Sequence, residues 1–335
     1  MRSKIQTIWE LMRGDRLLYL AALGGILLSA AVLYVTPLIS RTAIDHIIEG
    51  KPLALPSWAG DPVAWLGGRS VLARNLWIAG LGMILFTALG SLFTYLRGRW
   101  SALASESISR RLRDRLFDRL QRLPCRYHDK AETGDLVQRC TSDVETIRGF
   151  LSSQVVEIGR AVVLLLLGTG LMLYISPRMA LVSLAAIPAI VVFGILFFAR
   201  ISKAFRLSDE AEGKMTAIIQ ENLSGIRVVR AFARGEYEIQ KFAQRNNAYR
   251  DLWYRLMRVM AWYWSLSDLL CFAQNGLVLV VGAAWVMNGT LTVGGLVFFL
   301  SVVQMFIWPV RMLGRVLTEA GKAMVSVGRV AEILH

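Results

Sequence analysis

Long uncharged runs dominate the pattern of hydrophobic and polar positions along the 335-residue chain. An α-helix of roughly 17–25 apolar residues spans a hydrocarbon core ~30 Å thick at ~1.5 Å per residue. Four runs reach this length, and a fifth, from Leu269 to Val310, is long enough for two helices with Asn288–Gly295 as the turn between them. The pattern therefore predicts an all-α membrane protein with six transmembrane helices. Their expected positions are about 17–40, 75–97, 157–177, 179–199, 264–287 and 293–315.

The charged residues gather in two long connections, one after the second span and one after the fourth. Residues 97–154 and 200–260 are each about 60 residues long, and residues 97–123 continue the helical pattern of the second span without a break. A helix of ~25 residues is ~38 Å long. We therefore expect each connection to be a helical hairpin that extends far beyond the membrane and reverses at a short tip.

The chain carries 38 Lys and Arg against 24 Asp and Glu, a net charge of +14. Six spans place 32 of those 38 positive residues, together with both termini, on one side of the membrane. The positive-inside bias makes that side cytoplasmic. Because the positive residues are interleaved with acidic ones and no recognition module is visible, we expect no nucleic-acid partner.

The chain is expected to begin with a short helix that lies in the membrane interface. Ile5, Ile8, Trp9 and Met12 fall on one face of such a helix, with basic residues mostly off that face. The predicted organisation is an interfacial (elbow) helix over residues 1–16 and a six-helix domain over residues 17–320. The first apolar run is too long for a cleavable signal peptide. The three cysteines form no metal-binding or disulfide pattern and are expected to be free thiols.

The first hairpin reverses in the segment around residues 124–135. Pro124 ends the incoming helix because proline has no backbone N–H, and Cys125–Lys130 can form a short helix across the tip. We expect Gly134 to allow the reversal and Asp135 to cap the outgoing helix. Two ion pairs at i,i+4 spacing are then expected: Asp135–Arg139 and Arg139–Asp143.

The second hairpin reverses in the segment around residues 224–235. Ser224-Gly225 is expected to break the incoming helix, after which apolar and basic residues alternate on a short helix. The apolar edge consists of Ile226, Val229 and Phe232, and the arginines beside it are Arg227, Arg230 and Arg234.

These two tips resemble the coupling helices of ATP-binding cassette (ABC) exporters. The matching residues are Gly134, Asp135, Leu136, Arg139 and Asp143 in the first tip and Glu221, Gly225, Ile226, Val229, Ala231 and Phe232 in the second. Further matches extend the resemblance over essentially the whole chain: Pro37, Asp45, Pro309, Ala323, Ser326, Arg329, Ile333 and Leu334. The chain is therefore similar to the transmembrane domain of a multidrug or lipid half-transporter, in the ABC exporter fold (type I exporter, also termed type IV).

The resemblance implies a domain-swapped dimer, formed by two copies of one half or by two different halves, in a bacterial cytoplasmic (inner) membrane. Amphipathic substrates such as drug-like molecules, lipids or peptides would leave the cytoplasm or inner leaflet by alternating access. The first tip would contact nucleotide-binding domains through Tyr127, His128 and Asp129. The second tip would contact the nucleotide-binding domain of the partner half through Arg227, Val229, Arg230 and Phe232. An ATP-independent secondary transporter or stand-alone membrane module is the alternative, but no carboxylate lies at the level of a midplane ion site.

No ATP-binding motif is present in the sequence. Gly213-Lys214 and Gly321-Lys322 lack the neighbours of a phosphate-binding loop. We expect no catalytic residue, metal or cofactor on this chain, with ATP and magnesium held by an absent nucleotide-binding domain. Residues 321–335 would begin the linker to it. A chain cut at that domain boundary and a natural half with a separate ATPase both remain open.

Polar residues at the midplane are candidates for a substrate cavity. Gln274 and Asn275 lie 12–13 residues before Met287, which corresponds to a depth of ~18–20 Å. Gln304 lies at a similar depth, with Trp308 below it. Amides in membrane bundles also bond neighbouring helices, and this alternative stays open. Ser29 and Thr87 are interpreted as structural, and Arg160 and Asp268 as residues at the inner boundary.

Overall fold

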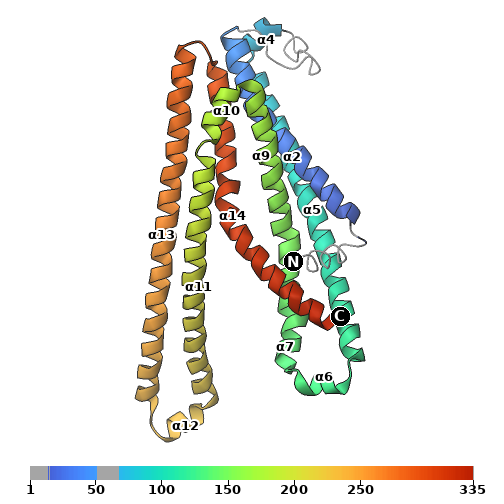
Figure 1. The fold of residues 1–335 in the computed structure, drawn as a ribbon, viewed down its shortest axis with the longest axis vertical. Helices are drawn as coiled ribbons and strands as arrows, with labels where there is room; N and C mark the ends of the chain where they lie inside the picture. Colours follow the sequence, from blue (N-terminus) through green and yellow to red (C-terminus); the bar gives the residue numbers. More distant parts are fainter. Residues whose placement is uncertain (1–13, 15, 51–67, 335) are drawn as a thin grey trace. The chain divides into compact units, whose positions relative to one another are not determined.

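A computed structural model describes Gly14, residues 16–50 and residues 68–334 (Figure 1). Within these ranges the regular structure is helical, and six segments are long and apolar enough to cross a membrane. These are Leu17–Ile48, Trp77–Arg122, Thr133–Ile175, Pro177–Ser224, Gly235–Met287 and Val293–Met312. The prediction of an all-α membrane protein with six transmembrane helices is thereby confirmed. The expected interfacial helix over residues 1–16 falls almost entirely outside the described residues.

The chain divides into two structural units, which are described separately. The first contains the described residues up to Ala186, Gln274–Val310 and residues 315–334. The second contains Ile187–Ala273 and Arg311–Gly314. Helices α13 and α14 contribute residues to both units. The helices, with π-helical turns labelled η, are α2 (Arg16–Thr42), η1 (Ala43–Ile48), α4 (Gly68–Arg74), α5 (Trp77–Arg122), α6 (Cys125–Lys130), α7 (Thr133–Gln138), η3 (Arg139–Asp143), α8 (Val144–Gly149), η4 (Phe150–Gln154), α9 (Val155–Ile175), α10 (Pro177–Leu184), α11 (Ile187–Ser224), α12 (Ile226–Ala231), α13 (Gly235–Met287) and α14 (Val293–Leu334).

The membrane-spanning part of the first unit is held together by α2, which packs against both α5 and α9. The Tyr34 hydroxyl on α2 is buried and donates a hydrogen bond of 2.7 Å to the carbonyl of Leu164 on α9. Gly168 lies one turn further along α9, where a Cβ atom would be 2.5 Å from both the Tyr34 hydroxyl and the Phe306 ring. A residue without a side chain is therefore required for α2, α9 and α14 to approach one another here.

The first hairpin (residues 97–154) has a hydrophobic core of its own. Helix α5 presents Ala104, Ile108, Leu112 and Leu116, spaced four residues apart on one face, and all four are buried. The returning leg adds three buried residues, and the end of α14 adds three more. These six are Val144, Ile147, Leu151, Val327, Val330 and Ile333. The expected linker segment 321–335 is therefore continuous with α14 up to Leu334 and packs against this hairpin.

The fourth span is interrupted, a feature that its uncharged sequence did not predict. Helix α10 begins with Pro177 at its first position and the Ser176 hydroxyl accepting from the Met179 N–H, and it ends at Leu184. Helix α11 begins after two turn residues, at Ile187. Pro188 explains the break because it has no backbone N–H to donate to the preceding turn of the helix.

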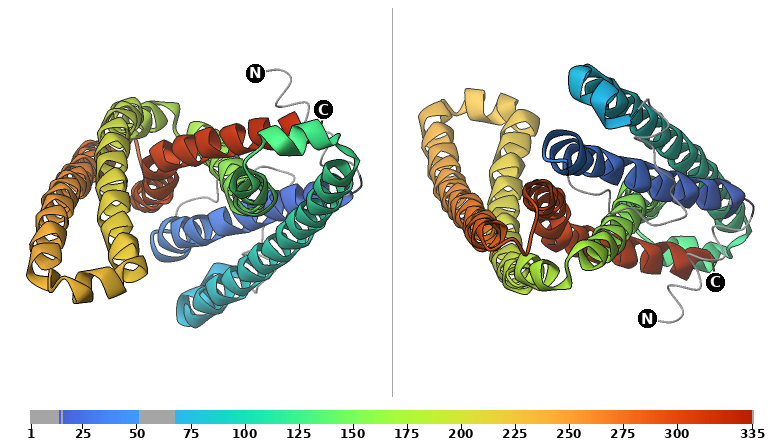
Figure 2. Two further views of the ribbon diagram at one scale, coloured as in Figure 1. Left: turned by 90° about the horizontal axis from the view of Figure 1, so that it is seen from below. Right: turned by 90° about the horizontal axis from the view of Figure 1, so that it is seen from above.

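The second hairpin (residues 200–260) belongs to the second unit and consists of two long helices. Helices α11 and α13 run side by side and are joined by α12, as both views of Figure 2 show. In contrast to the first hairpin, its only buried side chains among the described residues 200–260 are those of Ser208, Ile218 and Leu256. The long α5, α11 and α13 confirm the prediction of two helical hairpins.

Candidate functional site

The tip of the first hairpin is the helix α6, with the predicted limits Cys125 and Lys130. Pro124, in an extended conformation, separates it from α5. The side chains of Tyr127 and His128 make an edge-to-face contact at 5.8 Å, and His128 Nε2 lies 3.1 Å from the carbonyl of Leu120. His128 and Asp129 are exposed, whereas Tyr127 is half-buried. The tip thus presents polar groups on a short helix that is fixed to the end of α5.

Two predictions about the reversal were wrong. Gly134 lies inside α7, and the chain turns at Ala131 and Glu132, whose extended backbone any residue adopts. Asp135 does not cap α7, because the residue at the cap is Glu132, which makes no side-chain capping bond. Asp135 instead pairs with Arg139 at 2.9 Å, as predicted from their spacing.

The predicted pair of Arg139 with Asp143 is replaced by contacts to α14. The π-helical turn η3 lies between these two residues, and its wider turn takes an i,i+4 pair out of register. Arg139 forms an ion pair with Glu332 at 2.9 Å. Asp143 accepts a hydrogen bond of 2.8 Å from the Ser326 hydroxyl, and its carboxylate lies 3.6 Å from the Arg329 guanidinium. Asp143 and Ser326 are both buried. The returning leg of the first hairpin and the end of α14 are therefore joined by polar contacts as well as by the apolar core.

The tip of the second hairpin is the helix α12, which begins after Gly225, where α11 was predicted to end. Polar contacts join the helices on either side of it. Asn222 donates a hydrogen bond of 2.8 Å to the Glu238 carboxylate, and Lys241 forms an ion pair with Glu221 at 2.9 Å. The chain leaves α12 through Ala233, whose φ of 52° lies in the left-handed region.

The second tip exposes hydrophobic surface. Phe232 is 74% exposed and Val228 is 61% exposed, and Val229 is half-buried. Arg227 and Arg230 are exposed beside them. A hollow at this tip is lined by Val228, Val229, Phe232, Arg234, Tyr237 and Glu238. An apolar hollow with basic neighbours at the end of a long lever is suited to docking against another protein surface.

The four predicted cavity residues differ in their burial within this chain. Gln274 is buried and donates from Nε2 to the carbonyl of Ser183, next to the break in the fourth span. It therefore has the helix-bonding role that was the alternative interpretation. Asn275 is half-buried, whereas Gln304 and Trp308 on α14 are exposed within this chain.

Two boundary charges of the sequence have ion-pair partners. Arg160 pairs with Glu157 one turn earlier on α9. In the second unit, Asp268 pairs with Arg311 at 2.7 Å, and the Arg311 guanidinium also lies 4.7 Å from the centre of the Trp264 ring.

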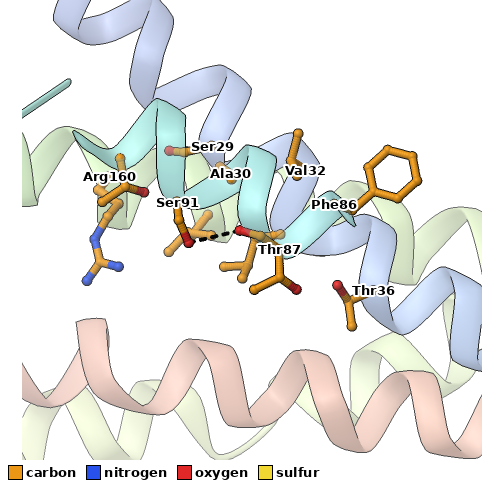
Figure 3. Close-up of a pocket in the computed structure, with 12 residues that line it drawn as sticks. Ser29, Ala30, Val32, Thr36, Phe86, Thr87, Ser91 and Arg160 are labelled. Atoms are coloured by element: carbon orange, nitrogen blue, oxygen red, sulfur yellow. Dashed lines mark hydrogen bonds between the residues drawn. The ribbon is translucent and has the colours of Figure 1, made fainter. Parts of the chain in front are cut away.

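A cavity of about 180 Å³ lies between α2, α5 and α9 in the first unit (Figure 3). Ser29 and Thr87, which the sequence indicated as structural, both line it. Three further hydroxyl side chains line the cavity with them: Thr36, Ser91 and Thr94. Arg160 and Phe86 complete the polar and apolar parts of the lining, and Figure 3 shows them at opposite ends.

Thr36, Ser91 and Thr94 were missed as cavity residues, although a signal for them exists in the sequence. Thr87, Ser91 and Thr94 stand at i, i+4 and i+7, and Ser29 and Thr36 are seven residues apart. Both spacings place the side chains on one face of a helix. Depth along the membrane alone, which guided the prediction, does not distinguish one face of a span from another.

Asp45 connects the ends of the first and sixth spans. Its carboxylate accepts hydrogen bonds of 2.6 Å from the Thr292 hydroxyl and 2.7 Å from the Gly294 N–H. The Nε atom of Arg41 lies 3.5 Å from the same carboxylate. A Cβ atom at Gly294 would lie 2.6 Å from the Arg41 carbonyl. Glycine is thus needed for the close approach that joins η1 to the start of α14.

The comparison with known proteins agrees with the sequence motifs. A sequence profile of the ABC transporter transmembrane region matches residues 19–310. An uncharacterized ABC transporter ATP-binding protein of Bacillus subtilis, YknU, is 31% identical over 96% of this chain and 51% of its own length. A multidrug efflux ATP-binding/permease protein of Mycobacterium bovis is 28% identical over 89% of this chain and 23% of its own. Antigen peptide transporter 2 of Rattus norvegicus is 27% identical over 73% of this chain and 35% of its own length. The chain thus spans about half, or less, of the length of these curated relatives.

Proposed function

The chain belongs to the family of ABC transporter transmembrane regions, and from that premise we propose that it is the membrane part of an ATP-driven exporter of amphipathic molecules. The observation that carries the proposal is the pair of long hairpins with short tip helices. Each converts a displacement at its tip into a movement of the spans from which it extends. Relatives named for multidrug efflux and for antigen peptide transport support drug-like and peptide substrates, and we include amphipathic lipids in the proposal.

ATP hydrolysis is assigned to nucleotide-binding domains outside these 335 residues. No stretch of the sequence has the phosphate-binding motif, and relatives that are about twice as long carry ATP-binding in their names. ATP and magnesium would be bound there, and this chain would supply the docking surfaces. The energy of nucleotide binding would reach the membrane-spanning helices through the contacts between the two tips and those domains.

The tips dock those domains through different kinds of surface. Tyr127, His128 and Asp129 offer polar contacts on α6, and Phe232 offers an exposed apolar anchor beside the hollow on α12. Val229 borders the same hollow, flanked by Arg227 and Arg230. After docking, Phe232 would be a buried aromatic side chain with arginines around it, a composition typical of energetic hot spots at protein interfaces.

A second half completes the transporter. The second hairpin exposes large apolar side chains along α11 and α13, among them Phe205, Trp253 and Tyr254. A two-helix hairpin that buries so few of its own side chains needs further surfaces to cover it. We assign those surfaces to the partner half, as a domain-swapped arrangement supplies, with either an identical or a different chain as partner.

The hairpins and both termini lie in the cytoplasm in this proposal, and the chain resides in a bacterial inner membrane. The segments assigned to that side hold 32 of the 38 Lys and Arg residues. Alternating access would expose the substrate-binding surface to each side in turn. Asn275, Gln304 and Trp308 remain candidates for that surface, whereas Gln274 is occupied in bonding Ser183.

Replacing Phe232 by Ala tests the proposal in the full-length transporter in proteoliposomes. We expect ATP hydrolysis to continue while ATP-dependent transport of a fluorescent amphipathic dye falls about ten-fold or more, because a hot-spot truncation costs at least ~2 kcal/mol of contact energy. Phe117→Ala, a change at an exposed phenylalanine of the first hairpin to which no docking role is assigned, is the matched control. Transport that needs no ATP would instead favour a secondary transporter, and unchanged coupling in Phe232→Ala would remove the assigned role of α12.

A further inference from the structure

Asp268 on α13 is the only acidic residue of the sequence between Asp251 and Glu319. It lies 19 residues before Met287, the last residue of the helix. At ~1.5 Å per residue this separation is about 28 Å, which corresponds to the inner end of the fifth span. Ionisable side chains in membrane-spanning helices are rare and mark substrate or ion pathways. Asp268 is therefore a candidate for such a pathway, beyond its ion pair with Arg311.

Arg311 is fixed behind this carboxylate, and both residues belong to the second unit. The Arg311 side chain is only 9% exposed, and its Nη1 donates a hydrogen bond of 2.7 Å to Asp268 Oδ1. The guanidinium also lies 4.7 Å from the centre of the Trp264 ring, and the Tyr263 hydroxyl donates 3.0 Å to the Arg311 carbonyl. Because Nε and Nη2 are inaccessible to solvent, no ligand reaches them. Arg311 therefore acts through Asp268, whose orientation it fixes.

The carboxylate of Asp268 is accessible, in contrast to its partner. The Asp268 side chain is 53% exposed, and Oδ2 accepts no hydrogen bond from the residues that the structure describes. A ligand that approaches here meets the negative end of the ion pair, with the positive end buried behind it. Such a dipole attracts a cation and repels an anion, most strongly where the surroundings are apolar.

The exposed face of α13 around Asp268 is apolar and partly aromatic. Phe272 lies four residues further along the helix, on the same face, and is 70% exposed. Leu269 and Ser265 are exposed beside them. The face of an aromatic ring attracts cations. A carboxylate next to an exposed phenylalanine thus matches a ligand that carries a positive charge on an apolar body.

We infer that Asp268 selects substrates by charge and that the substrate class is the amphipathic cation. Asp268 Oδ2 contacts the positive group, Phe272 contacts the apolar body, and Arg311 is a positioning residue. The inference rests on the proposed export function and narrows its substrate class. The inner end of a span is also where a molecule from the cytoplasm or the inner leaflet first meets the transporter.

Tetraphenylphosphonium and tetraphenylborate test this inference, because the two ions have nearly the same size and opposite charge. Equilibrium dialysis against the full-length transporter in neutral detergent measures the binding of each, with empty micelles as the blank. We expect the unmodified transporter to prefer tetraphenylphosphonium. Asp268→Asn should weaken tetraphenylphosphonium binding about ten-fold or more, because the Arg311 charge is then uncompensated, and should not weaken tetraphenylborate binding.

Arg311→Gln distinguishes charge selection from a purely structural ion pair. The variant leaves the carboxylate with its full negative charge, so tetraphenylphosphonium should bind at least as tightly as before. A structural ion pair predicts instead that Asp268→Asn and Arg311→Gln lose both ions alike, and that result would overturn the inference. Phe272→Leu keeps the test decisive if a charge variant does not fold. It retains the apolar area and should weaken only tetraphenylphosphonium, by about two- to five-fold.

Asp251→Asn is the matched control, because Asp251 is exposed on the same helix and is also paired with an arginine, Arg250. A loss in Asp251→Asn equal to that in Asp268→Asn would show general surface attraction and overturn the inference. Equal binding of the two ions to the unmodified transporter would do the same, since lipid or the partner half would then cover this face. Charge-selective binding without ATP-driven transport would count against the proposed function, whereas ATP-driven transport without charge selection would count against this inference alone.

Discussion

The two hairpins have similar length and opposite construction. Among the described side chains, the first hairpin buries eleven residues and the second buries three. The first also receives Val327, Val330 and Ile333 from the end of α14, whereas the second is joined across its tip mainly by polar contacts such as Lys241–Glu221. A lever that carries its own core is stiff by itself. A lever without one acquires its rigidity from what covers it, which fits a hairpin that reaches into a partner.

The largest difference should appear when apolar side chains are shortened. Ile147→Ala removes a side chain that is 1% exposed within the core of the first hairpin and should lower the free energy of unfolding by about 3 kcal/mol. Leu223→Ala in the second hairpin, at a position 69% exposed, should change it by less than ~0.5 kcal/mol. Denaturant unfolding of the purified chain in detergent measures both. Equal losses would mean that the second hairpin is as well packed as the first.

Glycine substitutions should have opposite signs in the two units. Gly168→Ala introduces a Cβ atom 2.5 Å from the Tyr34 hydroxyl and the Phe306 ring, and should destabilise the first unit by about 2 kcal/mol. Gly213→Ala on α11 meets nothing within 4 Å and should stabilise its exposed helix by up to ~1 kcal/mol. Thermal unfolding of the two variants side by side gives the comparison, and a shift in the same direction for both would contradict it.

The smallest effects concern charges. Asp143→Asn weakens a buried contact to Ser326 and Arg329 and should cost about 1.5 kcal/mol. Glu221→Gln removes an ion pair that is 68% exposed on the carboxylate side and should cost ~0.5 kcal/mol or less. Raising the salt concentration should abolish the smaller effect and leave most of the larger one. Stability measurements at low and high salt would reveal any departure from this order.

The features that were predicted from the sequence are those determined by local chemistry. Pro124 and Ser224-Gly225 mark where helices end, and uncharged runs mark where spans lie. Features that depend on distant contacts were not predicted. Gln274 donates to the carbonyl of Ser183 on another span, and η3 gives Asp143 partners on α14 that helical spacing does not indicate. The cavity between three helices was likewise missed, because depth in the membrane leaves the facing direction of a side chain undetermined.

The hydrogen bond between Gln274 and Ser183 has a consequence for the order in which the protein is made. The two residues are 91 positions apart, so the carbonyl of the fourth span receives its partner only after the fifth span has been synthesised. At ~5–20 residues per second, the interval is roughly 5 to 20 s. During biogenesis the interrupted span therefore waits in the bilayer with an unsatisfied backbone group, and arrival of the next span completes it.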